Sequence, residues 1–389
     1  MKHHWHIAEN KPDAAANLAQ ALGISNLLAQ CLMNRGLTNG AEAQSFLAPR
    51  LANLSAPEAI PNLPAAVERL FVARERNERI TVFGDYDVDG VTSSTLLVDC
   101  MRPLGWKMEA YLPHRMNEGY GLTVEGVANC LEEHETDLLL AVDCGSTSLD
   151  EITLLQEKGI PVIVLDHHQV SDPAPPAHAI VNPQLANEDE PDFRELCSVG
   201  LAFKLIHGLV KAGREKGLNG FVEFDIRTTL DLVALGTLAD MVPLQRENRI
   251  LAHAGLRQLN STKRPGILAL AKAAGITGRI GGFEVGFQIG PRLNAAGRLE
   301  SATAAMDLLR EADAAVATEL AEKLDRINRE RQLAEKEITR QVIDTVRNWF
   351  NPETDYVIVE GDAGWHIGVV GIVASRVMRK FYRPAVIVG

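Results

Sequence analysis

The sequence predicts an α/β protein built around a parallel sheet with helices on both faces. Between residues 65 and 185, short apolar runs alternate with segments of helical character, and this alternation is the pattern of βαβ units. Several of the apolar runs are followed at once by acidic residues or histidines. Because residues that follow neighbouring parallel strands meet along one edge of the sheet, the same pattern predicts where a ligand would bind.

The elements follow in order along the chain. Residues 1 to about 50 are Ala- and Leu-rich with helical spacing and predict a small helical segment, including a short helix over 41–47 before Pro49. The pattern then predicts strands at 80–83, 107–112, 138–142 and 161–165, a possible short strand at 179–181, and helices at 91–101, 123–133 and 148–158. Residues 196–275 are expected to be largely helical.

The C-terminal part predicts a spacer and the start of a second sheet. Residues 311–349 are poor in Gly and Pro and rich in Ala, Glu, Leu, Lys and Arg, which predicts one or two long helices. A strand at 356–359, a helix at 367–380 and a strand at 385–388 follow. Since two strands and one helix cannot bury their faces, we expect the chain to end inside a second, smaller α/β domain. The expected divisions are 1–64, 65–310, 311–349 and 350–389.

Length and composition describe an ordinary globular protein. The chain has 389 residues, of which 46% are hydrophobic and 23% charged. No apolar run approaches the roughly 18 residues of a membrane span, and the N-terminus has no apolar signal core, so we expect a cytoplasmic protein without membrane contact. The cysteines form no CxxC pair, which argues against structural zinc and disulfides. The N-terminal His3, His4 and His6 are interpreted as adventitious.

Net charge alone counts against a nucleic-acid partner. The formal charge is −12, whereas affinity for nucleic acids depends on Lys and Arg that neutralise phosphates. Basic residues nevertheless cluster within 326–340 and 376–383. The alternative interpretation is a solvated helical face, because Glu residues are interspersed among the basic ones.

Three carboxylates stand on alternate positions in the motif GDYDVDG. Asp85, Asp87 and Asp89 directly follow the apolar run 80–83, and like charges held this close raise one another's pKa unless cations neutralise them. The alternative is a solvated Asp/Gly turn. The pattern recurs, which favours a metal site. Asp143 follows a second apolar run, Asp166, His167 and His168 follow a third, and Asp240 follows the apolar helix expected at 230–238.

The residue types indicate which cation and which chemistry. Carboxylate oxygens with imidazole favour Mg²⁺ or Mn²⁺, and the histidines favour Mn²⁺. There are more candidate ligands than one octahedral ion needs, which predicts two ions, and paired ions suit phosphoester hydrolysis. Adjacent side chains beyond a strand diverge, so we expect His167 to be a ligand and His168 to support the site or face substrate. The alternative for His168 is an ordinary loop histidine.

Two further segments suit phosphates. In GPRLNAAGRLES (290–301), Arg292, Asn294 and Arg298 combine hydrogen-bond donors with glycines that let the backbone approach an anion. In GWHIGVVGIVASR (364–376), a glycine-containing turn leads into a helix whose first amides suit a phosphate. The alternatives are helix punctuation for the first segment and a common strand-to-helix turn for the second.

The ordered motifs GDYDVDG, VDCG (142–145), LDHHQ (165–169) and LADMVP (238–243) resemble the DHH phosphoesterases, and within them the RecJ family of bacterial single-strand exonucleases. The resemblance runs from about residue 65 to the end. It implies a DHH domain and a DHH-associated domain that face each other across a groove, spaced by the helix at 311–349. It also implies a Mn²⁺- or Mg²⁺-dependent enzyme that degrades single-stranded DNA from its 5′ end to mononucleotides in repair and recombination.

The resemblance also implies roles for single residues. The implied metal ligands are Asp87, Asp89, Asp143, His167 and Asp240, with Asp143 bridging, and the implied supporting residues are Asp85, Asp166 and His168. The implied phosphate contacts are Arg292, Asn294, Arg298 and His366. Single-stranded DNA is the expected partner of a monomer, with a single-strand-binding protein and a helicase as further partners.

Two departures from the family pattern qualify these expectations. Phe83 stands where pyrophosphatase-like relatives place a histidine, which counts against pyrophosphatase chemistry. The RecJ family also has a further DNA-binding domain after the DHH-associated one, so we expect this chain to hold DNA poorly. Two other functions stay open at this point: a DHH phosphodiesterase for oligoribonucleotides or cyclic dinucleotides, and a non-catalytic replication scaffold.

Overall fold

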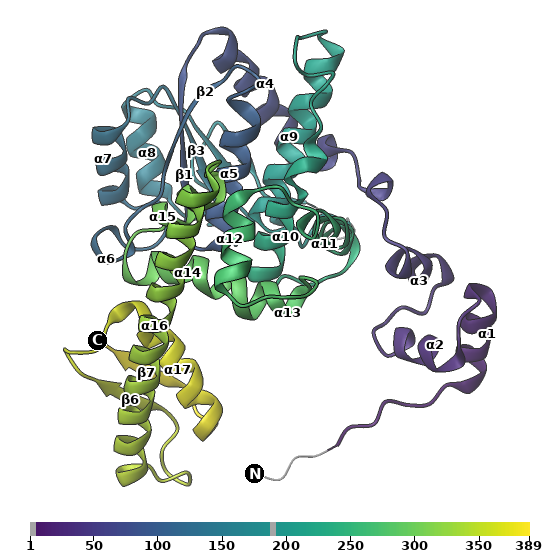
Figure 1. The fold of residues 1–389 in the computed structure, drawn as a ribbon, viewed down its shortest axis with the longest axis vertical. Helices are drawn as coiled ribbons and strands as arrows, with labels where there is room; N and C mark the ends of the chain where they lie inside the picture. Colours follow the sequence, from purple (N-terminus) through teal and green to yellow (C-terminus); the bar gives the residue numbers. More distant parts are fainter. Residues whose placement is uncertain (1–4, 187–191) are drawn as a thin grey trace.

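The computed structural model describes residues 5–186 and 192–389, so His3 and His4 lie outside the described residues. A parallel sheet of five strands, in the order β2-β1-β3-β4-β5, forms the centre of this described part (Figure 1). The strands are β1 (Arg79–Gly84), β2 (Lys107–Tyr111), β3 (Leu138–Val142), β4 (Val162–Leu165) and β5 (Ala179–Val181). The predicted parallel α/β architecture is confirmed.

Helices cover both faces of the sheet, as predicted. On one face, side chains of β1, β3 and β4 such as Phe83 and Leu139 form a small apolar core with α7 (Val124–Glu133) and α8 (Leu149–Glu157). The other face carries the larger core, which includes α4 (Leu63–Glu75), α5 (Val88–Met101) and α9 (Ser198–Glu215). The central strand β3 is buried along its whole length, which explains why it is apolar at every position.

From residue 198 to residue 310 the chain is largely helical, which confirms the prediction made for 196–275. The helices are α10 (Leu230–Ala239), α11 (Arg246–Leu259), α12 (Pro265–Ala273), the single turn α13 (Gly282–Glu284), α14 (Gly290–Leu299) and α15 (Thr303–Arg310). Between α13 and α14 lies a π-helix over Val285–Ile289. A short helix, α6 (Arg115–Glu118), follows β2. No helix in the described part of the chain is both long and apolar enough to cross a membrane.

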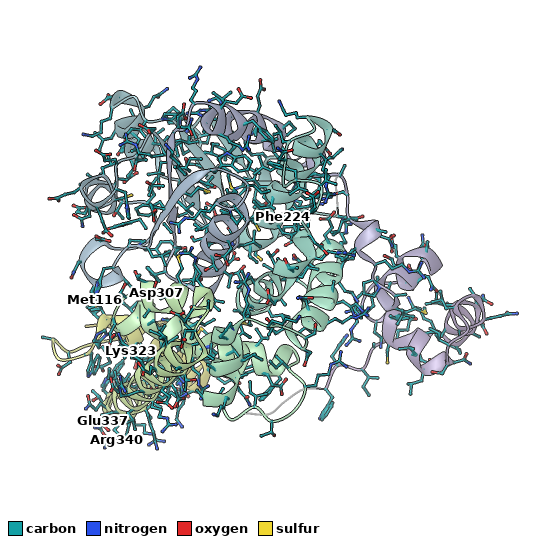
Figure 2. The ribbon with its side chains drawn as sticks, turned by 45° about the horizontal axis from the view of Figure 1, so that its top comes forward. Met116, Phe224, Asp307, Lys323, Glu337 and Arg340 are labelled. Carbon is teal, nitrogen blue, oxygen red and sulfur yellow. The ribbon has the colours of Figure 1, made fainter. Side chains whose placement is uncertain are left out.

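One continuous helix, α16 (Ala314–Trp349), joins the two sheets. Its 36 residues correspond to a length of about 54 Å. Leu324 and Ile327 from its first half belong to the larger core, whereas Val342 and Val346 from its second half pack in a separate core with α17 (Ile367–Phe381). Its outer side chains, such as Glu337 and Arg340, point into solvent (Figure 2). The expected spacer is therefore one helix anchored in two cores.

The second sheet and the N-terminal helices are small. Strands β6 (Ile358–Gly361) and β7 (Ala385–Val388) pair in parallel, with α17 between them in sequence. At the other end, α1 (Pro12–Leu22), α2 (Asn26–Met33) and α3 (Gly40–Leu47) share a core of their own. The predicted short helix at 41–47 is confirmed. The division of the chain into domains stays a prediction.

Two predicted boundaries were wrong. Helix α5 begins at Val88 rather than 91, because the Asp87 carboxylate accepts hydrogen bonds from the amides of Asp89 (2.8 Å) and Gly90 (3.2 Å) and caps the helix. Asp85 and Asp87 therefore lie on the turn between β1 and α5, and Asp89 lies in the first turn of α5. The strand expected at 356–359 lies two residues later, where Ile358 pairs with Ala385.

Candidate metal centre and substrate groove

Two of the predicted acids lie directly beyond neighbouring strands. Asp85 follows β1 and is 1% exposed, and one of its oxygens has no hydrogen-bond partner. Burial and the nearby Asp87 raise its pKa to about 7. Asp143 follows β3 in the left-handed region, with a φ of 63°, and accepts a hydrogen bond from the Ser198 hydroxyl (2.9 Å). Burial and neighbouring carboxylates raise its pKa well above the usual value.

Asp89 is held by the N-terminus of a different helix. Its carboxylate accepts hydrogen bonds from the backbone amides of Ser198 (2.7 Å) and Val199 (2.8 Å), the first residues of α9, where the helix dipole favours a negative charge. Helix α10 also passes close by, since a Cβ at Gly236 would lie 3.0 Å from Asp89 Oδ1. Burial and the charges of Asp240 and Asp87 nevertheless raise the Asp89 pKa.

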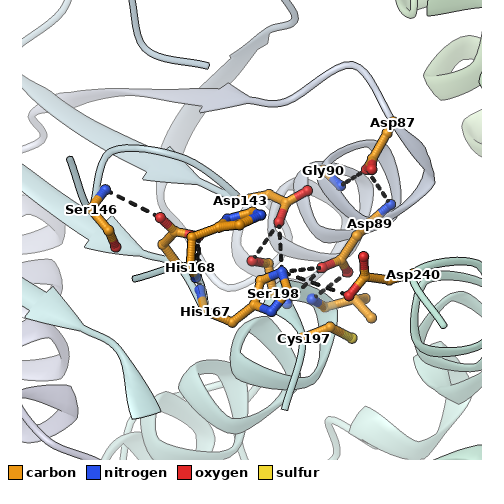
Figure 3. A network of polar contacts seen from close by, with 12 residues as sticks. Asp87, Asp89, Gly90, Asp143, Ser146, His167, His168, Cys197, Ser198 and Asp240 are labelled. Atoms are coloured by element: carbon orange, nitrogen blue, oxygen red, sulfur yellow. Dashed lines mark hydrogen bonds and ion pairs between the residues drawn. The ribbon is translucent and has the colours of Figure 1, made fainter. Parts of the chain in front are cut away.

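His167 faces the carboxylates across distances that suit an intervening cation. Its Nε2 lies 3.5 Å from Asp143 Oδ1, 3.7 Å from Asp240 Oδ2 and 4.0 Å from Asp89 Oδ2 (Figure 3). This buried nitrogen has no hydrogen-bond partner. Burial lowers the His167 pKa, so the ring is neutral at pH 7 and has a lone pair to share. An unpaired ring nitrogen among carboxylate oxygens is the donor set of a metal site.

His168 and Asp166 form a supporting pair beside this cluster. Asp166 accepts hydrogen bonds from His168 Nδ1 (2.7 Å) and from the amides of His167 (2.8 Å) and Ser146 (3.1 Å). These contacts engage both of its oxygens and hold His167 and His168 against the end of β4. The hydrogen bond to Asp166 raises the His168 pKa to about 9.

The arrangement fits divalent cations. Potential ligand atoms converge to within 4.8 Å in three sets: Asp143 with His167 and His168, Asp89 with Cys197 and Asp240, and Asp85 with Asp87 and Asp143. Cys197 is the weakest of these candidates, because burial raises the pKa of its thiol well above the usual value and only a thiolate binds metal well. The remaining oxygen and imidazole donors suit Mn²⁺ or Mg²⁺.

A groove of about 1080 Å³ opens beside the cluster. Asp85, Tyr86 and Asp87 contribute to its lining, and the rest comes from the segment around α6, the π-helix, α14, α16 and α17. The basic residues that line it are Arg115, Arg298, Arg331, Lys336, Arg376 and Arg379. Part of each basic cluster noted in the sequence therefore faces a cavity, although the chain is acidic overall.

The four predicted phosphate contacts differ in their surroundings. Arg298 lines the groove. Arg292 is instead paired with Asp325 of α16 (2.8 Å) and donates to the carbonyl of Gln288 (2.6 Å). Asn294 Oδ1 accepts a hydrogen bond from the amide of Val88 (3.0 Å), which steadies the start of α5. His366 caps α17 by accepting from the amide of Gly368 (3.0 Å). For all four, contact with a phosphate stays a prediction.

The sequence did not single out several residues around the groove. Tyr86 and Tyr120 are in edge contact, with ring centroids 5.9 Å apart, and the Arg115 guanidinium lies 5.2 Å from the Tyr86 ring centroid. Arg115 and Tyr120 follow β2, so their position beyond a strand end was the signal available. Glu335 pairs with Arg331 and Arg376. These contacts join α16 to α17, a pairing that the sequence offers no means to predict.

Comparison with known proteins agrees with the fold. Residues 79–237 match the family described as DHH family, N-terminal domain, the class that the strand-end acids define. The single-stranded-DNA-specific exonuclease RecJ of Bacillus subtilis is 37% identical over 389 residues, which cover 100% of this chain and 48% of that protein. The RecJ exonuclease of Escherichia coli is 35% identical, with 99% of this chain and 67% of that protein covered.

A solved structure of a RecJ protein also has a similar fold. RecJ of Thermus thermophilus in complex with Mn²⁺ has a TM-score of 0.82 and 33% identity, covering 98% of this chain and 53% of that chain. The chain belongs to the RecJ family. It spans about half the length of the Bacillus subtilis and Thermus thermophilus proteins.

Proposed function

We propose that this chain is a metal-dependent exonuclease that hydrolyses single-stranded DNA in the 5′-to-3′ direction to 5′-mononucleotides, in DNA repair and recombination. The observation that carries the proposal is the unpaired, buried Nε2 of His167 facing Asp89, Asp143 and Asp240 at the head of a basic groove. Relatives named as single-stranded-DNA-specific exonucleases support the substrate, and a relative solved with Mn²⁺ supports the cofactor.

Two Mn²⁺ or Mg²⁺ ions are the proposed cofactors. Asp85, Asp87 and Asp143 would hold one, and Asp89, Asp240 and His167 the other, with Asp143 close enough to His167 to be shared. When bound, such ions activate a water and stabilise the leaving oxygen of a phosphodiester.

The protein's own residues bind and orient the substrate. Arg298 and Arg331 face the groove beside the acids and would neutralise the phosphates of the strand. In the metal-free protein, the raised pKa of His168 favours the protonated imidazole at neutral pH. It therefore adds a positive charge next to the carboxylates, positioned by Asp166 (2.7 Å), and would attract the phosphate that is to be cleaved.

The groove favours a strand over a small substrate. Its lining combines Asp85 and Asp87 with basic residues of α16 and α17, among them Arg331 and Arg379, so phosphates other than the one that is cleaved would also meet positive charge. A non-catalytic scaffold is disfavoured, because all the acids predicted as metal ligands are present and occur in the converging sets. The proposal also includes action as a monomer in the cytoplasm, with a single-strand-binding protein and a helicase as partners.

The test compares substrates of different length and polarity. The purified chain with Mn²⁺ is incubated with 5′-labelled and 3′-labelled single strands, the corresponding duplex and a dinucleotide. The proposal expects a mononucleotide to be the first product from the 5′-labelled strand, with little cleavage of the duplex. Equal rates on the dinucleotide and the long strand would instead assign the chain to the small-substrate phosphodiesterases.

A further inference from the structure

Two exposed phenylalanines lie side by side next to the groove. Phe283 is 61% exposed and Phe287 is 71% exposed, and their ring centroids are 5.0 Å apart with an angle of 30° between the planes. Large aromatic side chains are usually buried, so two that lie together on the surface indicate a site of interaction. Phe287 lies on the π-helix Val285–Ile289, a form of helix that is frequent at functional sites.

The position of this aromatic pair ties it to the site. The π-helix leads directly into α14, which carries Arg298, and Phe287 and Pro291 both line the groove. The start of α14 also packs against the end of α10, since a Cβ at Gly290 would lie 3.4 Å from the Cβ of Ala239. Asp240, one of the proposed ligands, is the next residue. The π-helix that carries Phe287 is therefore anchored beside the end of α10, where Asp240 lies.

The groove lining combines two kinds of side chain. Phe287 and Pro291 contribute apolar surface from the π-helix and α14, whereas Arg331 and Lys336 of α16 and Arg376 and Arg379 of α17 supply positive charge. A single strand of nucleic acid offers a partner for each kind, with charged phosphates along one edge and unpaired base faces along the other. In a duplex the base faces are already stacked within the helix, so they would not be free to contact Phe287.

We propose that Phe287, braced by Phe283, forms a stacking surface for the bases of the substrate strand, while the basic residues of α16 and α17 hold its phosphates. This inference rests on the proposed function and deepens it, because it assigns to Phe287 a part in the choice of single strands over duplexes. The occupant is an unpaired base, since the surface is continuous with a positively charged groove rather than with an isolated apolar patch.

The experiment measures binding without cleavage. The affinity of the full chain is determined by fluorescence anisotropy in EDTA for an oligothymidylate and for an abasic strand of the same length. Phe287→Ala is expected to weaken binding of the oligothymidylate about fivefold or more and to leave binding of the abasic strand unchanged. Phe287→Trp should retain the wild-type affinity, because it keeps an aromatic face.

A matched control excludes a general effect of removing an exposed apolar side chain. Leu268 on α12 is 54% exposed and is not among the residues that line the groove, so Leu268→Ala should bind both strands like the wild type. If the wild type binds both strands equally, or Phe287→Ala weakens both equally, the stacking surface is refuted. Dimerisation that Phe287→Ala abolishes would also refute it, by showing that a second copy covers the surface.

The outcome is separable from that of the proposed function. Mn²⁺-dependent cleavage of single strands by a wild type that does not distinguish the abasic strand would leave the exonuclease standing and remove the stacking surface. If the wild type instead binds the oligothymidylate more tightly than the abasic strand but cleaves neither with Mn²⁺, the stacking surface stands and the exonuclease is refuted.

Discussion

His168 Nδ1 lies 2.7 Å from Asp166 Oδ1, and the two residues shift each other's pKa in opposite directions. The pKa of His168 is raised to about 9, first by its hydrogen bond to Asp166. Burial opposes the effect at Asp166, but its hydrogen bonds and the charge of His168 lower its pKa to about 2. The contribution of His168 to stability is complete below its unfolded pKa and disappears as the pH rises through 9. That of Asp166 is present above its unfolded pKa and disappears as the pH falls towards 2.

The first prediction concerns this pair. In Asp166→Asn the His168 pKa should fall towards its ordinary value of about 6.5, because the carboxylate charge and its acceptor are lost. NMR titration of the imidazole ¹⁵N shifts in the metal-free protein measures the His168 pKa directly. Asp172→Asn, in the following loop, is the control and should leave the His168 pKa unchanged. A His168 pKa that is the same in Asp166→Asn and the wild type would show that the pair does not couple as the distance implies.

The second prediction concerns the carboxylates themselves. Asp143→Asn should abolish Mn²⁺ uptake and cleavage, since Asp143 belongs to two of the converging sets. Asn is preferable to Ala here because the residue has a φ of 63°, which Asn tolerates better. In EDTA the variant should melt at a higher temperature than the wild type. The raised pKa of Asp143 means that its charge destabilises the metal-free fold increasingly as the pH rises above its unfolded pKa.

Calorimetry and thermal melts at pH 5 and pH 8 check this second prediction. The excess stability of Asp143→Asn in EDTA should be larger at pH 8 and should vanish when Mn²⁺ saturates the wild type, because only the wild type gains binding energy. Full nuclease activity in the variant would remove Asp143 from the site.

The third prediction is that Mn²⁺ uptake releases protons. Burial and neighbouring acids raise the pKa of Asp85 to about 7 and also raise that of Asp89, so part of the metal-free protein carries protons on its ligands at pH 7. A cation must displace them. The apparent affinity for Mn²⁺ should therefore increase as the pH rises from 6 to 8. Titration calorimetry in two buffers of different ionisation enthalpy counts the protons, and identical heats in both buffers would contradict the prediction.

The fourth prediction concerns Glu335, a buried carboxylate in a basic groove. It pairs with Arg331 (3.0 Å) and with Arg376 and so fixes two guanidinium groups at the groove. Glu335→Gln removes a negative charge from the groove, and by charge alone this change would strengthen DNA binding. We expect weaker binding, because both arginines lose their orientation. The salt dependence of log K should also become shallower, by about 0.7 for each phosphate that the arginines no longer neutralise.

Glu337→Gln is the matched control for Glu335. Glu337 lies on the same helix, but it is exposed and lies outside the groove lining, where it forms an ion pair with Arg340 (2.6 Å) and accepts a hydrogen bond from Gln341 (3.0 Å). Its replacement should leave the salt dependence unchanged. Affinities measured at several salt concentrations separate the two effects, and tighter binding by Glu335→Gln would mean that charge outweighs positioning.

The sequence predicted site residues best where those residues directly follow a strand. The acids after β1 and β3 and the histidines after β4 could be placed at one site because parallel strands end along one edge. The wrong start of α5 came from the same motif, since the pattern shows an acid at Asp87 but not that its side chain caps a helix. Glu335 and Phe287 could not be predicted, because their importance depends on how α14, α16 and α17 pack.

Arg292 shows the limit of residue type as evidence. Its guanidinium suits a phosphate, yet in the fold it is paired with Asp325, a residue 33 positions away. Which partner an arginine takes is decided by the helix that packs beside it.

Lys204 is a similar case. The sequence suggested no clear role for it, and the fold buries it completely.

The last prediction concerns this buried lysine. Lys204 Nζ lies 2.9 Å from Glu247 Oε2 and donates to the carbonyl of Ser55 (2.7 Å), so it joins α9 and α11 to the segment before α4. Both side chains are fully buried. Lys204→Met would leave the Glu247 charge without its cation, which costs about 3–5 kcal/mol. Lys211, which lies on the same helix as Lys204, forms an exposed pair with Glu58 (2.7 Å), so Lys211→Met should cost far less stability than Lys204→Met. Urea unfolding of both variants measures the difference, and equal costs would show that the buried pair contributes no more than the exposed one.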